Sequence, residues 1–144
     1  MLNDYYSILE TTYPSNQLEI KKQYRLLAKK WHPDINSALD ATIKMQIITE
    51  AYYVLSNNRA KQLYDDEYLK KYGSKSDFGS RENTNRNNYD KNTDSNIIND
   101  ELIDWINKAK IKSNEFVTQV INTTKGASLL GIKTAGKAFL KIIL

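Results

Sequence analysis

The chain has 144 residues, of which 40% are hydrophobic and 26% charged, and its formal net charge is +4. It contains no cysteine, which excludes a disulfide scaffold, a cysteine nucleophile and a cysteine-based zinc site. The basic excess is too small to make nucleic acid the expected partner. The N-terminus lacks the features of a signal peptide, and no apolar run of about 18 residues occurs, so we expect a cytoplasmic protein without a transmembrane helix.

The first helices are predicted from capping residues and apolar periodicity. Residues 4–10 are typical of a short helix, and a longer helix is expected to begin at Ser15, its N-cap. Glu19 near its start and Lys29 and Lys30 near its end suit the helix dipole. One face of this helix carries an apolar stripe at helical spacing: Ile20, Tyr24, Leu27 and Trp31.

A second long helix is predicted over residues 38–56, and it can pack antiparallel on the first. The connection between the two is short, as is usual for neighbouring helices. A shorter, highly charged helix is predicted over residues 59–72, and it ends at Gly73. The apolar residues of the second long helix recur at three- and four-residue spacing: Met45, Ile48, Ala51, Tyr52 and Leu55.

The tripeptide His32-Pro33-Asp34 separates the two long helices. Pro33 cannot continue a helix and biases His32 toward extended geometry, so we expect an exposed turn that presents His32 and Asp34 to solvent. His32 is the only histidine of the chain. A metal site there would need carboxylates alone, and a catalytic dyad would lack a nucleophile. We therefore expect no metal, no cofactor and no enzymatic activity.

The second half of the chain has a different composition. Residues 73–98 are rich in asparagine and aspartate and poor in apolar side chains, which predicts a flexible polar linker. Residues 99–144 are predicted to form an amphipathic helical hairpin, with helices at about 99–122 and 127–144 and a break at Thr123–Gly126. The last helix would carry a row of lysines opposite its apolar side: Lys133, Lys137 and Lys141.

The wide apolar faces of this hairpin predict that it is not an inert tail. Two helices alone bury little surface, so the hairpin should pack on itself, self-associate, fold back on the first half of the chain, or bind a partner. A lysine row opposite an apolar face is also the pattern of an interfacial membrane helix. The sequence leaves these alternatives open.

Four segments, in order and with matching spacing, resemble the J domain of DnaJ-type co-chaperones. They are Asp4–Leu9, Glu19–Asp34, Glu50–Ser56 and Arg59–Asp65. The resemblance covers half of the chain and implies an all-α fold of four helices with antiparallel long helices over residues 1–72. No Gly/Phe-rich region and no zinc-binding cysteines follow, so the chain looks like a J protein of reduced type.

The resemblance implies a co-chaperone that binds a DnaK-type chaperone and stimulates its ATPase. In this family the loop aspartate, here Asp34, pairs with a chaperone arginine, and His32 and Pro33 hold the loop. The resemblance also implies that a basic helix face meets an acidic chaperone surface, here through Lys21, Lys22, Arg25 and Lys29.

The chain departs from the common family pattern at three places. Leu26 stands where many members have a basic residue, Glu10-Thr11 replaces a common Gly-Val, and Lys61 stands where arginine is usual. Two other functions stay open. The protein could be a targeting or adaptor protein whose residues 99–144 tether the J domain to a membrane, as a peripheral protein, or to a client. Nucleic-acid binding by the lysine face is the least favoured, because that face is interrupted.

Overall fold

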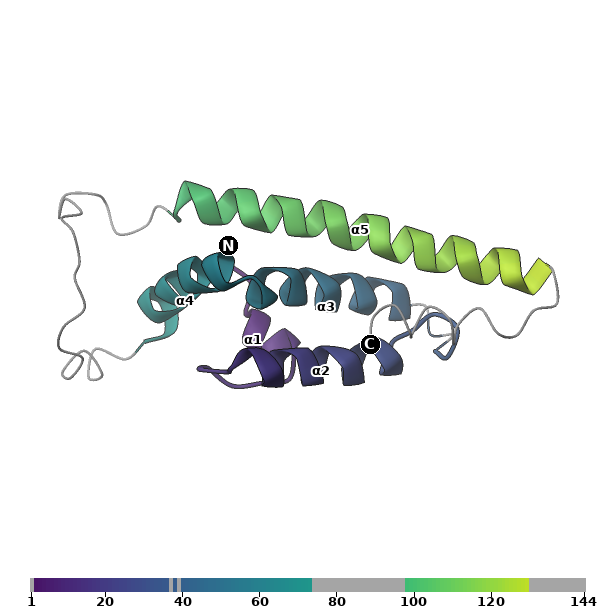
Figure 1. Ribbon diagram of the computed structural model, residues 1–144, viewed down its shortest axis with the longest axis horizontal. Coiled ribbons are helices and arrows are strands. Elements are labelled where there is room, and N and C mark those ends of the chain that lie inside the picture. Colours follow the sequence, from purple (N-terminus) through teal and green to yellow (C-terminus); the bar gives the residue numbers. More distant parts are fainter. Residues whose placement is uncertain (1, 37, 39, 74–97, 130–144) are drawn as a thin grey trace.

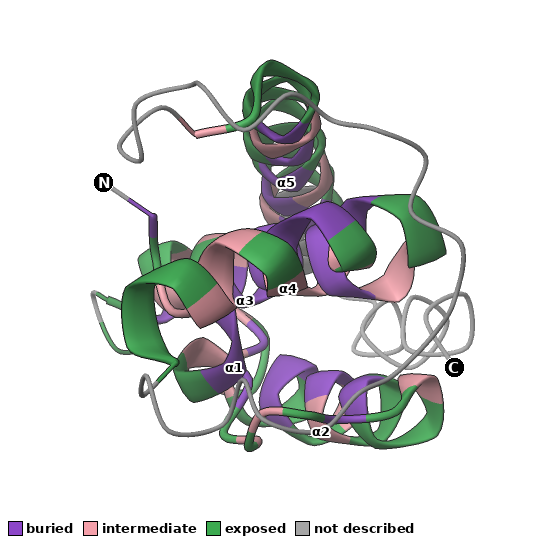
Figure 2. Ribbon diagram, turned by 90° about the vertical axis from the view of Figure 1, so that its left-hand side faces the viewer, coloured by how far each residue is buried: buried purple, intermediate pink, exposed green. Residues whose placement is uncertain are grey.

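A computed structural model of the protein describes residues 2–36, 38, 40–73 and 98–129 (Figure 1). These residues form helices and no strands, which confirms the predicted all-α class. In Figures 1 and 2, α3 lies between α2 and α5. The short helix α1 and the helix α4 also pack against α3. The helices are α1 (Tyr5–Ile8), α2 (Gln17–Lys30), α3 (Ala41–Ser56), α4 (Asn58–Tyr72) and α5 (Asp100–Leu129).

The two predicted apolar stripes of α2 and α3 are confirmed as the centre of the core. Tyr24 and Tyr52 stack across this pair with ring centroids 4.0 Å apart and planes 8° from parallel. Stacking of aromatic rings stabilises a core beyond the burial of their surface. The other stripe residues that are buried are Ile20, Leu27, Met45, Ile48, Ala51 and Leu55.

The predicted start is wrong by one residue for α2 and by three residues for α3. Asn16, not Ser15, caps α2, because its side-chain oxygen accepts a hydrogen bond from the Glu19 N–H at 2.9 Å. The Ser15 hydroxyl is buried and donates instead to the Thr12 carbonyl. The first residue of α3 is Ala41 rather than residue 38, so the connection between the long helices is longer than predicted.

Three tyrosine hydroxyls join α1 to α3 and α4. The Tyr5 hydroxyl donates to the buried Glu50 carboxylate at 2.7 Å. The Tyr64 hydroxyl accepts from the Tyr5 backbone N–H at 2.8 Å, and the Tyr6 hydroxyl donates to Asp65. Buried polar groups need such partners, so these contacts fix α1 across the rest of the domain. These hydrogen bonds hold segments that lie far apart in the sequence side by side in the fold.

The end of α1 is a Schellman turn with a glutamate in its left-handed position. The Thr11 N–H donates to the Tyr6 carbonyl and the Glu10 N–H to the Ser7 carbonyl, both at 3.0 Å. Glu10 has φ = 51°, which glycine adopts without the steric cost that a Cβ brings. This departure from the family pattern therefore has a structural consequence.

The predicted helix break at Thr123–Gly126 is wrong. α5 continues through these residues to Leu129 as one helix of 30 residues. A single glycine costs only about 1 kcal/mol inside a helix, which is too little to end it by itself. The rest of the predicted last helix, residues 130–144, and most of the predicted linker lie outside the described residues. None of the described helices combines the length and the apolar character that crossing a membrane requires.

α5 folds back on the first half of the chain and runs along α3, on the side away from α2 (Figure 1). Five of its residues are buried at helical spacing, namely Leu102, Ala109, Ser113, Val117 and Val120. Three of them, Leu102, Ala109 and Val117, belong to the same apolar cluster as the residues of α2 and α3. The core of the domain is therefore shared with α5.

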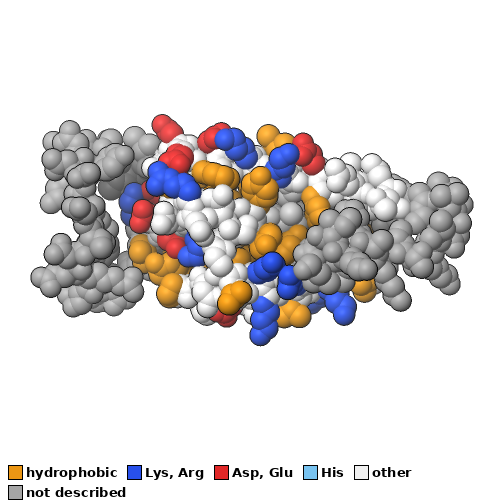
Figure 3. Space-filling view, in the orientation of Figure 1, with side chains coloured by type: hydrophobic (Ala, Val, Ile, Leu, Met, Phe, Trp, Pro, Cys, Tyr) orange, Lys and Arg blue, Asp and Glu red, His pale blue; other side chains and the backbone are white. Residues whose placement is uncertain are grey.

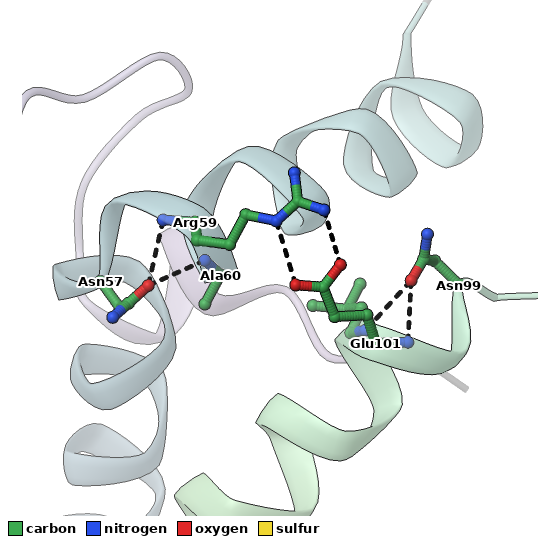
Figure 4. A network of polar contacts seen from close by, with 6 residues as sticks. Asn57, Arg59, Ala60, Asn99 and Glu101 are labelled. Atoms are coloured by element: carbon green, nitrogen blue, oxygen red, sulfur yellow. Dashed lines mark hydrogen bonds and ion pairs between the residues drawn. The ribbon is translucent and has the colours of Figure 1, made fainter. Parts of the chain in front are cut away.

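The two starting points of α4 and α5 are joined by an ion pair (Figure 4). The Arg59 guanidinium donates two hydrogen bonds to the Glu101 carboxylate, at 3.0 and 2.6 Å. Asn57 caps α4 and Asn99 caps α5 beside this pair. Because both charged side chains are about half exposed, the pair adds little stability, but its two-point geometry orients the start of α5 relative to the start of α4.

We predict that Glu10→Gly raises the free energy of unfolding by up to about 1 kcal/mol, because glycine relieves the left-handed conformation. Urea unfolding followed by circular dichroism measures this change. Glu10→Ala is the control, since it keeps the strained conformation and removes only the exposed contact with Lys30, 3.9 Å away. A stability gain in the alanine variant equal to that of the glycine variant would contradict the explanation.

We predict that Leu102→Ala destabilises the whole described fold by roughly 2–5 kcal/mol, as expected for a fully buried leucine. Ile111→Ala, on the exposed side of α5, should change stability by less than about 0.5 kcal/mol. Circular dichroism and Trp31 or Trp105 fluorescence should report one shared transition. If the transition of Trp31 does not move in the Leu102 variant, α5 is not part of the cooperative unit.

Candidate functional site

The loop after α2 is closed by backbone hydrogen bonds. α2 ends at Lys30, and the Trp31 N–H still donates to the Leu27 carbonyl at 2.9 Å. The His32 carbonyl then accepts from the N–H groups of Ile35 and Asn36, at 2.9 and 2.8 Å. This turn carries Pro33 and Asp34 at its tip, as predicted from the sequence.

Asn36 holds the two ends of the loop together. Its side-chain amide donates to the Lys30 carbonyl at 3.3 Å, and its side-chain oxygen accepts from the Ala38 N–H at 3.0 Å. Sequence reasoning missed this residue. Its type was a usable signal, because asparagine often bonds the backbone within turns.

The prediction that the His32 side chain faces solvent is wrong. It is only 2% exposed, and its Nδ1 accepts a hydrogen bond from the Asp34 N–H at 3.2 Å. In the neutral ring the proton is therefore on Nε2, which is buried and has no hydrogen-bond partner among the described residues. Burial lowers the pKa of His32, and the nearby Asp34 carboxylate opposes this shift only in part. A neutral His32 thus supports the loop from inside.

Asp34 has the opposite environment. Its side chain is 24% exposed, and its carboxylate accepts no hydrogen bond from any described residue. The His32 Nδ1 atom lies 3.8 Å from the Asp34 carboxylate. It carries no proton when it accepts the hydrogen bond from the backbone, so it forms no ion pair with Asp34. The carboxylate is therefore free to accept hydrogen bonds from a partner.

The predicted basic residues lie together on the outward side of α2, opposite the buried stripe. Lys21, Lys22 and Lys29 are exposed, Arg25 is half-buried, and the three lysines form no ion pair with the described residues. α5 is on the far side of α3, so it leaves this face uncovered (Figure 2). Figure 3 shows Lys and Arg side chains interspersed with hydrophobic ones along the lower edge of the molecule, over α2.

A groove of about 280 Å³ lies beside the loop, between the first turns of α3 and the last turns of α2. The Lys44 ammonium lies 3.9 Å from the centre of the Trp31 ring in this groove, a cation–π contact that sequence reasoning missed. Such a contact stiffens the base of the loop. The groove is lined by Ile8, Glu10, Leu27, Trp31, Lys44, Ile47 and Ile48.

The depressed pKa of His32 predicts a pH-dependent stability. The pKa of the His32 ring is about 6.5 in the unfolded chain and lower in the fold, so the unfolded state binds a proton more readily. The stability is therefore full above about pH 6.5 and decreases as the pH falls below that value. We expect the free energy of unfolding to fall as the pH is lowered through about 6.5. His32→Gln should flatten this slope, because the chain has no other histidine. Urea titrations at several pH values test this, and an unchanged slope would contradict it.

Comparison with known proteins identifies the first part of the chain. The family model of the DnaJ domain matches residues 4–65. The chain is 48% identical over 62 residues to the chaperone protein DnaJ of Oceanobacillus iheyensis and to that of Mycoplasmoides gallisepticum. It is 40% identical over 79 residues to the DnaJ of Macrococcus caseolyticus.

These matches cover only part of each protein. The first two span 43% of this chain and 16% of the relative, and the third spans 55% of this chain and 21% of the relative. The matched region holds α1, α2, α3, the loop between the long helices and the first half of α4. Residues 4–65 of this chain are therefore a J domain, a member of the DnaJ domain family.

Proposed function

We propose that this protein is a J-domain co-chaperone that binds a DnaK-type chaperone and stimulates its ATPase. The observation that carries the proposal is the Asp34 carboxylate, which is partly exposed and accepts no hydrogen bond from the described residues, on a loop fixed from inside by His32. The basic face of α2, which no other described helix covers, leads directly to this loop. The match of residues 4–65 to the DnaJ domain supports this interpretation of the site.

The proposed contact has two parts with different physical roles. Asp34 would accept two hydrogen bonds from one chaperone arginine, an arrangement that is strong and specific in orientation. The loop is already ordered by Asn36 and His32, so little conformational entropy is lost when it binds. Lys21, Lys22, Arg25 and Lys29 would attract an acidic surface over a longer range and set the register.

In this proposal the protein itself breaks no covalent bond. Its contacts would favour one conformational state of the chaperone over another, which is how a binding protein can accelerate a partner's reaction. The tethering alternative finds no support in α5, since the apolar face of α5 is buried against α3 rather than offered to a membrane or a client.

We predict that Asp34→Asn abolishes the stimulation of a bacterial DnaK in single-turnover ATPase assays. The variant removes the charge needed for the arginine contact, and its melting temperature should stay within about 2 °C of the wild type because the side chain supports no described contact except that near His32. Asp66→Asn is the matched control, because Asp66 is exposed on α4. Retained stimulation by Asp34→Asn would refute the proposed function.

A further inference from the structure

We propose that Leu18 and Leu26 make the outer face of α2 a mixed apolar and basic surface, and that it binds an apolar strip within an acidic region of the DnaK-type chaperone. This inference rests on the proposed function and goes beyond it, since it assigns two contact residues and a surface chemistry to the partner. Leu18 is 82% exposed and Leu26 is 56% exposed.

The spacing along α2 places both leucines among the basic residues. Leu18, Lys22, Arg25 and Lys29 follow one another at i, i+4, i+7 and i+11, which is one stripe of a helix. Leu26 lies four residues after Lys22 and three before Lys29, so it borders the same stripe. Neither leucine belongs to the apolar core cluster.

A single exposed leucine on a protein surface needs no explanation. Here two of them share one helix face with three lysines that form no described ion pair, and that face continues into the Asp34 loop. The aliphatic stems of Lys22 and Lys29 can lie beside the leucines and extend the apolar area while the ammonium groups stay in water. The surface that complements such a face is apolar at its centre and acidic around it.

Charge complementarity and continuity with the Asp34 loop indicate that the DnaK-type chaperone is the partner that binds this face. A partner that binds Asp34 through an arginine comes to lie beside the last turns of α2, and therefore over Lys29 and Leu26. An acidic partner surface would neutralise the unpaired lysines. Leucines buried in the same contact would add affinity that salt does not screen, whereas the ionic contribution weakens as salt is added.

The test compares the full-length wild type with the double variant Leu18→Gln, Leu26→Gln. The affinity of each protein for ATP-loaded bacterial DnaK is measured at about 0.05 M and about 0.5 M salt. We expect the double variant to bind DnaK at least about tenfold more weakly than the wild type at both salt concentrations, and to keep the salt dependence of the wild type. In ATPase assays it should need more protein for half-maximal stimulation but reach the same maximum.

The controls separate this inference from the proposed function. Ile111→Gln changes an apolar residue on α5 that is about as exposed as Leu26, and it should leave the affinity unchanged. If stimulation depends on Asp34 but the leucine variant binds within about twofold of the wild type at both salt concentrations, this inference alone is overturned. If the wild type does not stimulate or bind DnaK, the proposed function falls and the inference falls with it.

Discussion

The structure depends on the burial of α3, because every other helix packs against it. Four consecutive residues of α3, Ile48 to Ala51, are buried, so this turn of the helix is covered on all sides. A helix that is buried all round needs neighbours on all sides. α2 covers one side, α5 covers the opposite side, and α1 and α4 cover the C-terminal end. α5 is thus a structural element of the domain rather than an appendage.

This arrangement separates the parts that support the fold from the parts available to a partner. Since α5 occupies the far side of α3, none of the described helices covers the outward face of α2. Inside the loop, a buried neutral His32 accepts from the backbone, and Asn36 joins the two loop ends. The result is a carboxylate, Asp34, held in position without a hydrogen-bond partner in the part of the chain that the structure describes. Rigid support of an unpaired charged group is what an orientation-specific contact requires.

The sequence by itself determined the features that depend on neighbouring residues in the chain. Apolar residues at helical spacing predicted the facing stripes of α2 and α3, because a helix must bury one continuous stripe. Pro33 predicted the end of α2, since proline removes a hydrogen-bond donor and clashes with the preceding turn. The order of these elements, with the loop between them, was enough to indicate the J domain. The roles of Asp34 and of the basic residues in binding stay predictions.

Only the tertiary structure decided the features that depend on contacts between distant segments. The sequence could place His32 in a turn, but whether its ring faces the core or solvent depends on what packs around it, and the expectation of exposure was wrong. Gly126 suggested a helix end, yet α5 continues past it, because local propensities of about 1 kcal/mol are too weak to decide. The apolar face of α5 was visible in the sequence. Its partner was not, because periodicity shows that a face must be covered and carries no information about which helix covers it.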